Sequence, residues 1–340
     1  MSYRITPVSA AIPERRRLAV FLAAFVLTGG LAVPRRGDDD PSAWERRMSS
    51  WWDKNPHCHE DSPKGYLLEK NGALVGFSGL IPYGYECDGK PVPSLVSTSL
   101  FVESAHRSAV VGLLARQRAL GDDWQIIDGS PSPEMGRLLA HLGYRSAGDR
   151  AQYLFPARLG GGGLARQALL ARDWSFSLPA AGEAVGCRLV LDPEEWNGFS
   201  VPQDGRIHRA SDRATTQWLL HSGSEPKRFF GLLGEDGDPI ACALAAPKRS
   251  AGFCASLLLD HRDHHPGGAG LALLMRKLID SPEGVLFPGT RVVVLSRFGG
   301  GTLQGSPGRR MPSDLWYHLP PSWQNHTKAC LPIEGDLALL

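Results

Sequence analysis

The chain has 340 residues, of which 42% are hydrophobic and 21% are charged, as in water-soluble globular proteins. This length is comfortable for two domains of ordinary size. The formal net charge is only +2 and large basic blocks are missing, so a dominant nucleic-acid function is not indicated.

The N-terminal residues predict a short strand followed by a helix. Tyr3 to Val8 alternates as a strand does, and Pro13 opens a helix that runs to about Leu27. The apolar run from Leu18 to Val26 could imitate a signal peptide, but it is too short to span a bilayer, and mostly polar or turn-forming residues precede it. We therefore expect a buried amphipathic helix. The six scattered cysteines, with no Cys-x-x-Cys pair, predict reduced thiols in a cytoplasmic protein.

An aromatic helix and a hairpin are predicted next. The helix carries three tryptophans between residues 44 and 52, which we expect in the core, and it ends at Asn55-Pro56. Asn71-Gly72, the preferred pair for a type I′ turn, lies between two strand-like segments in the range 65–80. A second turn signal, Asp88-Gly89, leads into a third strand. The pattern predicts three antiparallel strands in succession.

The third strand is followed by a sharp change from strand to helix. Ser97–Val102 is rich in β-branched, hydroxyl-bearing and aromatic residues, whereas Ala109–Leu120 reads as a helix. The turn at Glu103–Ser108 would aim the free N–H groups of the helix's first turn at one spot, where they and the helix dipole stabilise an anion. Arg107 adds a positive charge there. Taken alone, the stretch fits an ordinary connection with a solvated arginine equally well.

One more strand and one more helix complete this part of the chain. Trp124–Asp128 is a short strand of the buried type, and Pro133–His141 is a predicted helix that closes on Leu142-Gly143-Tyr144.

The order of these elements resembles the GNAT (GCN5-related N-acetyltransferase-like) acyltransferase superfamily. Motif A of that family is an apolar strand followed by Arg/Gln-x-x-Gly-x-Gly/Ala at the start of a helix. The aligned residues here run from Arg107 to Gly112, with Val110 at the place of the family's first glycine. The Leu142-Gly143-Tyr144 ending is similar to the signature that closes the family's fourth helix. Together with the hairpin, the resemblance covers about residues 1–156, and it implies an α/β (α+β) fold with a mixed, mainly antiparallel twisted sheet flanked by helices.

The resemblance also implies an active site with acyl-CoA or acetyl-CoA as co-substrate and no permanently bound cofactor. Two parallel strands, Ser97–Val102 and Trp124–Asp128, would splay apart around the pantetheine arm. The backbone of one strand would bind pantetheine through Leu100, Phe101 and Val102. The phosphates would lie at Arg107, Ser108, Ala109, Val110, Val111 and Gly112. Because Leu139 stands where the family has a helix-four tyrosine, we expect Asp128, or water relayed through Ser99, to act in catalysis.

The second part of the chain repeats the same order of elements. Two strand-like segments, 228–233 and 239–245, flank a Gly-rich turn, and a third strand, a glycine-bearing turn with Gly268 and Gly270, a helix and another strand follow. His265 stands in this copy where the first copy has Arg107. We predict two GNAT-like domains, at residues 1–157 and 174–340, joined by a Gly-rich linker at residues 158–173.

Other chemistries find less support in the sequence. Two histidine clusters, at residues 57–60 and 260–265, lack a second ligand pair at zinc-site spacing, so no metal site is predicted. The chain has no Gly-x-Ser-x-Gly elbow for serine catalysis, and the glycines at 160–163 lack the Lys-Ser/Thr of a nucleotide loop.

The sequence therefore predicts an acyltransferase that uses an acyl-thioester donor and an amine or hydroxyl acceptor on a small molecule or sugar, with no membrane span. Two alternatives stay open. One is a tandem-GNAT aminoacyl transferase that uses aminoacyl-tRNA, although such proteins usually need a basic surface. The other is a non-catalytic binding module, which Val110 and Leu139 favour.

Overall fold

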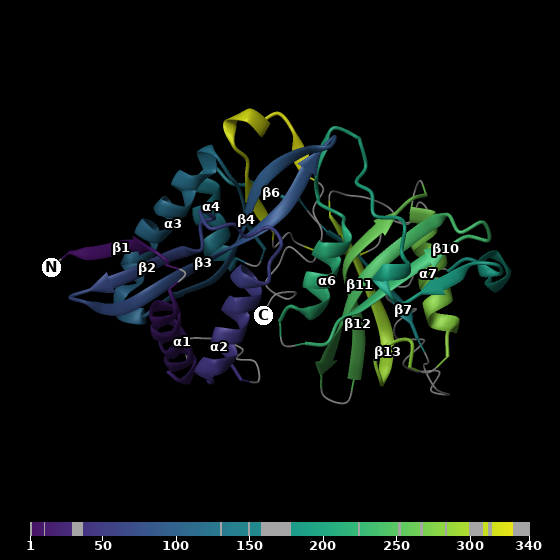
Figure 1. Cartoon of the computed structure of the whole chain (residues 1–340), viewed down its shortest axis with the longest axis horizontal. Coiled ribbons are helices and arrows are strands. Elements are labelled where there is room, and N and C mark those ends of the chain that lie inside the picture. The colour runs from purple at the N-terminus through teal and green to yellow at the C-terminus, as the bar shows by residue number, and fades with distance from the viewer. Residues whose placement is uncertain are drawn as a thin grey trace.

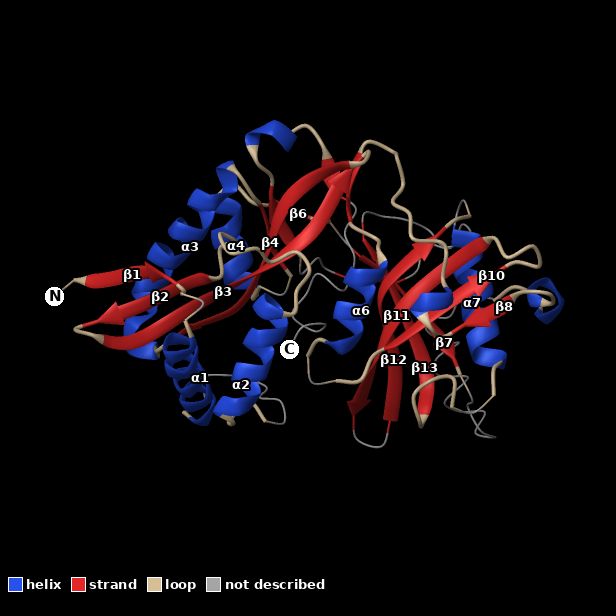
Figure 2. Ribbon diagram, viewed as in Figure 1, coloured by secondary structure: helices blue, strands red, loops and turns tan. Residues whose placement is uncertain are grey.

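The computed structural model describes residues 2–9, 11–28, 37–129, 131–148, 150–157, 178–223, 225–250, 253–265, 268–282, 284–298, 309–311 and 315–328. Within these residues the chain forms two twisted sheets, each flanked by helices, as Figures 1 and 2 show. The predicted fold class is confirmed. Among the described residues, no helix combines the length and apolar character that a membrane span requires.

The first sheet is mainly antiparallel, and among the described strands of its main path the one parallel pair is β4 and β5. Its main path runs in the order β1 (Tyr3–Pro7), β2 (Gly65–Lys70), β3 (Ala73–Cys87), β4 (Lys90–Val102), β5 (Gln125–Asp128), β15 (Trp316–His318) and β6 (Arg145–Ser146). The hairpin between β2 and β3 has Asn71 at φ 52° and Gly72 at φ 82°, as the predicted type I′ turn requires.

Helices cover both faces of the first sheet (Figure 1). They are α1 (Ile12–Leu27), α2 (Pro41–Met48) with the π-helical η1 (Ser49–Asp53), α3 (Val110–Ala119) and α4 (Pro133–His141). Phe101 packs with α1 and α2, whereas the next residue of the strand, Val102, packs with Leu113 of α3. Successive strand residues point to opposite faces, so the two helix pairs lie on opposite sides of the sheet. The predicted tryptophan core is confirmed, since Trp44, Trp51 and Trp52 are all buried.

The second sheet repeats this arrangement. Its order is β14 (Arg309–Met311), β7 (Arg150–Pro156), β13 (Thr290–Phe298), β12 (Phe253–Asp263), β11 (Pro239–Ser250), β10 (Arg228–Leu233) and β8 (Arg188–Val190). Here β12 and β13 form the parallel pair, and α7 (Ala269–Asp280) follows β12 as α3 follows β4. Helix α6 (Arg213–His221) precedes β10. The predicted repetition of strand, turn, helix and strand is therefore present.

On its main path, each sheet takes one strand from the other part of the chain. Strand β15, near the C-terminal end, pairs with β5 and β6 in the first sheet, and β7 pairs with β13 and β14 in the second. The two donated strands occupy equivalent positions, next to the second strand of each parallel pair. The division at residues 157 and 174 stays a prediction, and the expected linker, 158–173, lies outside the described residues.

Further contacts join the two sheets. Strand β9 (Arg206–Arg209) pairs with β3 and with β16 (Thr327–Lys328), while Arg209 forms an ion pair with Asp260 of β12. Trp218 of α6 donates a 2.8 Å hydrogen bond from its indole N–H to the carbonyl of Ser50. Short 3₁₀ helices complete the described structure: η2 (Ser104–Ala109), η3 (Leu120–Asp122), η4 (Ala181–Ala184), η5 (Pro193–Glu195) and η7 (Pro321–Trp323).

Candidate active site

The parallel pairing of β4 with β5 ends at Ser97 and Asp128, and β4 continues beyond this point along β3 to Val102. We call this place the β4/β5 split. The pairing of β3 with β4 shifts register here, between Phe77 and Gly79, which marks a β-bulge. Ser99 lies in the bulge with φ 52°, in the left-handed region that L-residues rarely adopt. A strained backbone inside a strand is a feature that clusters at functional sites.

The two predicted catalytic residues lie at this split but on different faces of the sheet. Ser97 accepts a 3.1 Å hydrogen bond from Gln117 of α3, and Asp128, its register partner, shares that face. Thr98 points to the other face, and the hydroxyl of Ser99 lies 3.3 Å from the hydroxyl of Thr98. The structure therefore brings Ser99 and Asp128 to one end of the split without bringing their side chains to the same face.

Sequence reasoning missed two side chains near Asp128, Trp316 and Tyr144, and a third, His318, which lies next to Tyr144. Trp316 of β15 is the register partner of Asp128, and α4 lies against the indole, because a Cβ added to Gly136 would be 3.3 Å from Trp316 Nε1. Tyr144 is buried, and this burial together with the negative charge of Asp128 raises the pKa of its phenol. The ring of His318, also on β15, lies 5.7 Å from the ring of Tyr144. The sequence quoted Tyr144 only as part of a helix ending, and no local signal points to Trp316 or His318.

The predicted phosphate-binding turn forms the 3₁₀ helix η2, and α3 begins at Val110. In η2 the N–H groups bond to carbonyls three residues earlier, as at His106 (2.8 Å to the Glu103 carbonyl), and the Val110 N–H donates to the Arg107 carbonyl. Arg107 is exposed and has no ion pair with any side chain in the described parts of the chain. Gly112 lies close to β1, since an added Cβ would meet Ile5 at 3.0 Å. The phosphate contacts of residues 107–112 stay a prediction.

The corresponding split in the second sheet is closed. The pairing of β12 with β13 ends at Leu257 and Val294, and a register shift near Leu244 marks a bulge here as well. Beyond that point His261 Nε2 donates a 3.0 Å hydrogen bond to the Ser296 carbonyl, so a side chain bridges the two strands.

The start of α7 is occupied by the chain's own carboxylate. Asp263 accepts hydrogen bonds from the N–H groups of His265 (2.9 Å) and Leu271 (3.2 Å). Gly270 makes room for it, because a Cβ at this residue would lie 2.5 Å from Asp263 Oδ1. The position where a helix N-terminus would hold an external anion is therefore filled by an internal one.

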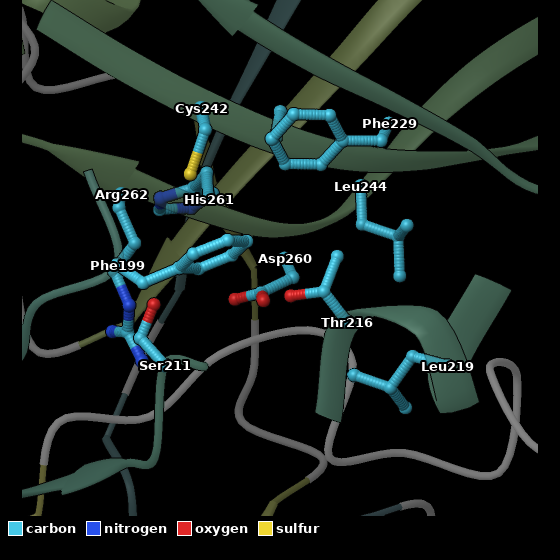
Figure 3. A pocket seen from close by; sticks show the side chains of 11 residues that line it. Phe199, Ser211, Thr216, Leu219, Phe229, Cys242, Leu244, Asp260, His261 and Arg262 are labelled. Carbon is cyan, nitrogen blue, oxygen red and sulfur yellow. The ribbon is translucent and has the colours of Figure 1, made fainter. Parts of the chain in front are cut away.

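A small void lies beside this closed split, and Figure 3 shows the side chains that line it. Its volume is about 10 Å³, which is room for about one water molecule. Cys242 faces it, but burial raises the pKa of this thiol to about 11, so the reactive thiolate is not formed at neutral pH. The void has neither the space nor the chemistry of a substrate site.

The histidine clusters of the sequence take structural positions in the described chain. His57 Nε2 lies 2.7 Å from the hydroxyl of Thr215, which in turn donates to Asp212. His264 packs near the ring of Trp196, with a ring separation of 6.1 Å. Among the described residues, no three His, Cys, Asp or Glu side chains group as metal ligands would.

No protein-family model and no curated protein matches this sequence, but solved structures share its fold. A GCN5-related N-acetyltransferase from Anabaena variabilis ATCC 29413 is 13% identical with a TM-score of 0.57, and the match covers 93% of this chain and 72% of that one. A probable N-acyltransferase of unknown function from Enterococcus faecalis V583 is 10% identical with a TM-score of 0.57 and the same coverage. Saccharomyces cerevisiae N-myristoyltransferase with bound myristoyl-CoA is 13% identical with a TM-score of 0.51, over 100% of this chain and 85% of that one. The chain therefore has the GNAT fold, built from two GNAT-like sheets with their flanking helices.

Proposed function

We propose that the protein is an acyltransferase that moves an acyl group from acyl-CoA to an amine or hydroxyl of a small molecule or sugar. The donor would bind at the β4/β5 split of the first sheet. The observation that carries this proposal is the difference between the two sheets: β4 has a strained bulge at Ser99 beside the end of its pairing with β5, while His261 bridges the equivalent strands of the second sheet.

The donor would lie along the bulged end of β4. Its pantetheine amides would bond to the backbone of Leu100, Phe101 and Val102, and its phosphates would lie near Arg107, whose exposed charge has no described partner. An acyl-CoA donor is supported by the yeast enzyme of the same fold, which was solved with bound myristoyl-CoA. The second sheet offers no equivalent place, because Asp263 fills the start of α7.

In the proposed reaction the acceptor's lone pair attacks the thioester carbonyl, and the C–S bond breaks as the new C–N or C–O bond forms. Asp128 would take the acceptor's proton, directly or through water relayed by Ser99. The thiolate would leave unaided or take a proton from water. Since the side chains of Ser99 and Asp128 face opposite sides of the sheet, a water relay between them would have to pass between β4 and β5 at the split.

A non-catalytic binding module is the second candidate, and two observations favour it. The 3₁₀ helix η2 pairs N–H groups that an open turn would present to phosphates. The buried Leu139 also packs with Ile126 and Tyr144 where an acid for the leaving thiol would be needed.

Calorimetric titration with acetyl-CoA and with a long-chain acyl-CoA tests the donor site. We expect binding by the native protein, at least tenfold weaker binding by Arg107→Glu, and unchanged binding by Arg16→Glu. Arg16 is a matched control, because it is 78% exposed on α1, on the opposite face of the sheet. Absence of binding by the native protein would refute the acyl-CoA proposal, as would equal loss in both variants.

A second assay separates the enzyme from the binding module. Release of free thiol from bound acyl-CoA would be followed in the presence of a panel of amines and amino sugars. Acceptor-dependent release, lost in Asp128→Asn, supports the enzyme. Tight binding without release under any of these acceptors supports the binding module instead.

A further inference from the structure

A second cavity, unrelated to the β4/β5 split, lies at the edge of the second sheet. It has a volume of about 680 Å³, within the range of small-molecule sites. Its walls come from residues 191–193, the end of α6, residues 226–230 and residues 284–285. The end of α6 and residues 226–230 are close in the sequence, and the fold brings residues 191–193 and 284–285 to them.

Two of the walls are held in place by specific bonds. Glu194, beside the first wall, pairs with Arg213 of α6 (3.1 Å) and accepts a hydrogen bond from Gln217 (3.2 Å). Arg228 donates to the carbonyls of residues 284, 285 and 286, and its guanidinium lies 5.1 Å from the centre of the Phe287 ring. Nη1 of Arg228 therefore holds the loop in place.

Lys227 is the other cation that lines the cavity. Its ammonium donates to the carbonyl of Ser222, just after the C-terminal end of α6, and this is its one hydrogen bond to the described chain. A lysine ammonium carries three donors, so two are left for water or a ligand. Burial lowers the pKa of Lys227 to about 8, with the charge of Glu225 acting in the opposite direction. The group is therefore mostly charged at pH 7, although much of its surface is shielded from water.

The surface around Lys227 is largely apolar. Leu191, Leu220 and Val285 line the cavity, and Leu191 is 51% exposed, so its apolar side chain is accessible to a ligand. Asp192 also lines the cavity, and one of its carboxylate oxygens accepts a hydrogen bond from the N–H of Glu194. An anion with a second negative charge would be repelled by Asp192.

From these contacts we propose that the cavity binds a small amphipathic monocarboxylate, with its carboxylate on Lys227 Nζ and its apolar part against Leu191, Leu220 and Val285. The ammonium supplies a charge-assisted hydrogen bond, and the apolar wall removes the tail from water. This site is separate from the proposed donor site and does not depend on acyl transfer.

Titration of the full chain with decanoate at pH 7 tests the proposal. Decanoate should bind, whereas acetate, which lacks the tail, and decyltrimethylammonium, which has the opposite charge, should bind at least tenfold more weakly. Lys227→Met should weaken decanoate binding at least tenfold. Lys277→Met is the matched control, because Lys277 also donates to a carbonyl, that of Ala184 (3.4 Å), but lines a different cavity. Equal binding of the cationic probe, or equal loss in both lysine variants, would overturn the proposal.

A second variant and a competition experiment complete the test. Leu191→Asp places a negative charge at an exposed position of the cavity lining, so it should remove decanoate binding without unfolding the chain, even if Lys227→Met proves unstable. Saturating acetyl-CoA should leave decanoate binding unchanged, and Arg107→Glu should bind decanoate like the native protein. Displacement of decanoate by acetyl-CoA would show that the carboxylate occupies the donor site, and would refute a separate cavity site.

Discussion

Replacing Arg209 with methionine tests how strongly the ion pair between the sheets holds them together. Arg209, on a strand paired with β3, is 2% exposed, and its partner Asp260 on β12 is 12% exposed. Methionine fills similar space but leaves the Asp260 carboxylate buried without its guanidinium. Removing one partner of a buried ion pair costs about 3–5 kcal/mol, because the remaining charge keeps its desolvation cost. We expect Arg209→Met to lower the free energy of unfolding by about this amount.

The measurement is urea unfolding followed by tryptophan fluorescence. Arg213→Met is the control, since the Arg213–Glu194 pair is about half exposed on both sides and should contribute less than about 1 kcal/mol. The double variant Arg209→Met/Asp260→Leu removes both charges and should recover most of the loss. If Arg209→Met is no more destabilising than Arg213→Met, the reasoning from burial is wrong.

Two other predictions concern the split and the contact between the sheets. Ser99→Val puts a β-branched residue at φ 52° and should lower the free energy of unfolding by about 1–2 kcal/mol. Ser99→Gly should change the free energy of unfolding by less than about 1 kcal/mol, because glycine adopts this φ without strain. Equal midpoints of urea unfolding for the two variants would contradict this prediction. Burial lowers the pKa of His57, so the unfolded chain binds more protons as the pH falls through 6.5, and stability decreases there. His57→Gln should reduce this loss of stability between pH 7 and pH 5, as measured by thermal unfolding, and an unchanged slope would argue against it.

Features set by neighbouring residues were predictable from the sequence. The Asn71-Gly72 turn lies where it was expected, and α4 spans Pro133–His141 as predicted. The strand before Arg107 and the helix after it are also present, with α3 starting at Val110. In each case the signal is local, since a turn pair, a capping residue or a hydrophobic period lies within the element itself.

The surroundings of the candidate site were not predictable in the same way. Strand β15 has only three residues, which is too short to show a period, and its pairing with β5 joins residues that are far apart in the sequence. Trp316 therefore reaches Asp128, and His318 reaches Tyr144, through tertiary pairing alone. The bulge was not predicted for another reason. Ser99 adopts the left-handed backbone conformation although it is not a glycine, so its residue type does not indicate that conformation. The closure of the second split depends in the same way on the long-range bond between His261 and Ser296.

Because β7 lies in the second sheet and β15 in the first, the order in which the ribosome makes the strands affects folding. A ribosome releases β5 and β6 long before β15, so the first sheet leaves the ribosome with a gap between these two strands, and their edges stay open for pairing with other chains. Strand β7 is also made early and waits for the partners β13 and β14. Closing such long loops adds little to the equilibrium cost of folding but slows it, because distant pairings form late. Neither sheet can be completed until nearly the whole chain has been translated, and premature termination before β15 would leave the first sheet open beside Asp128.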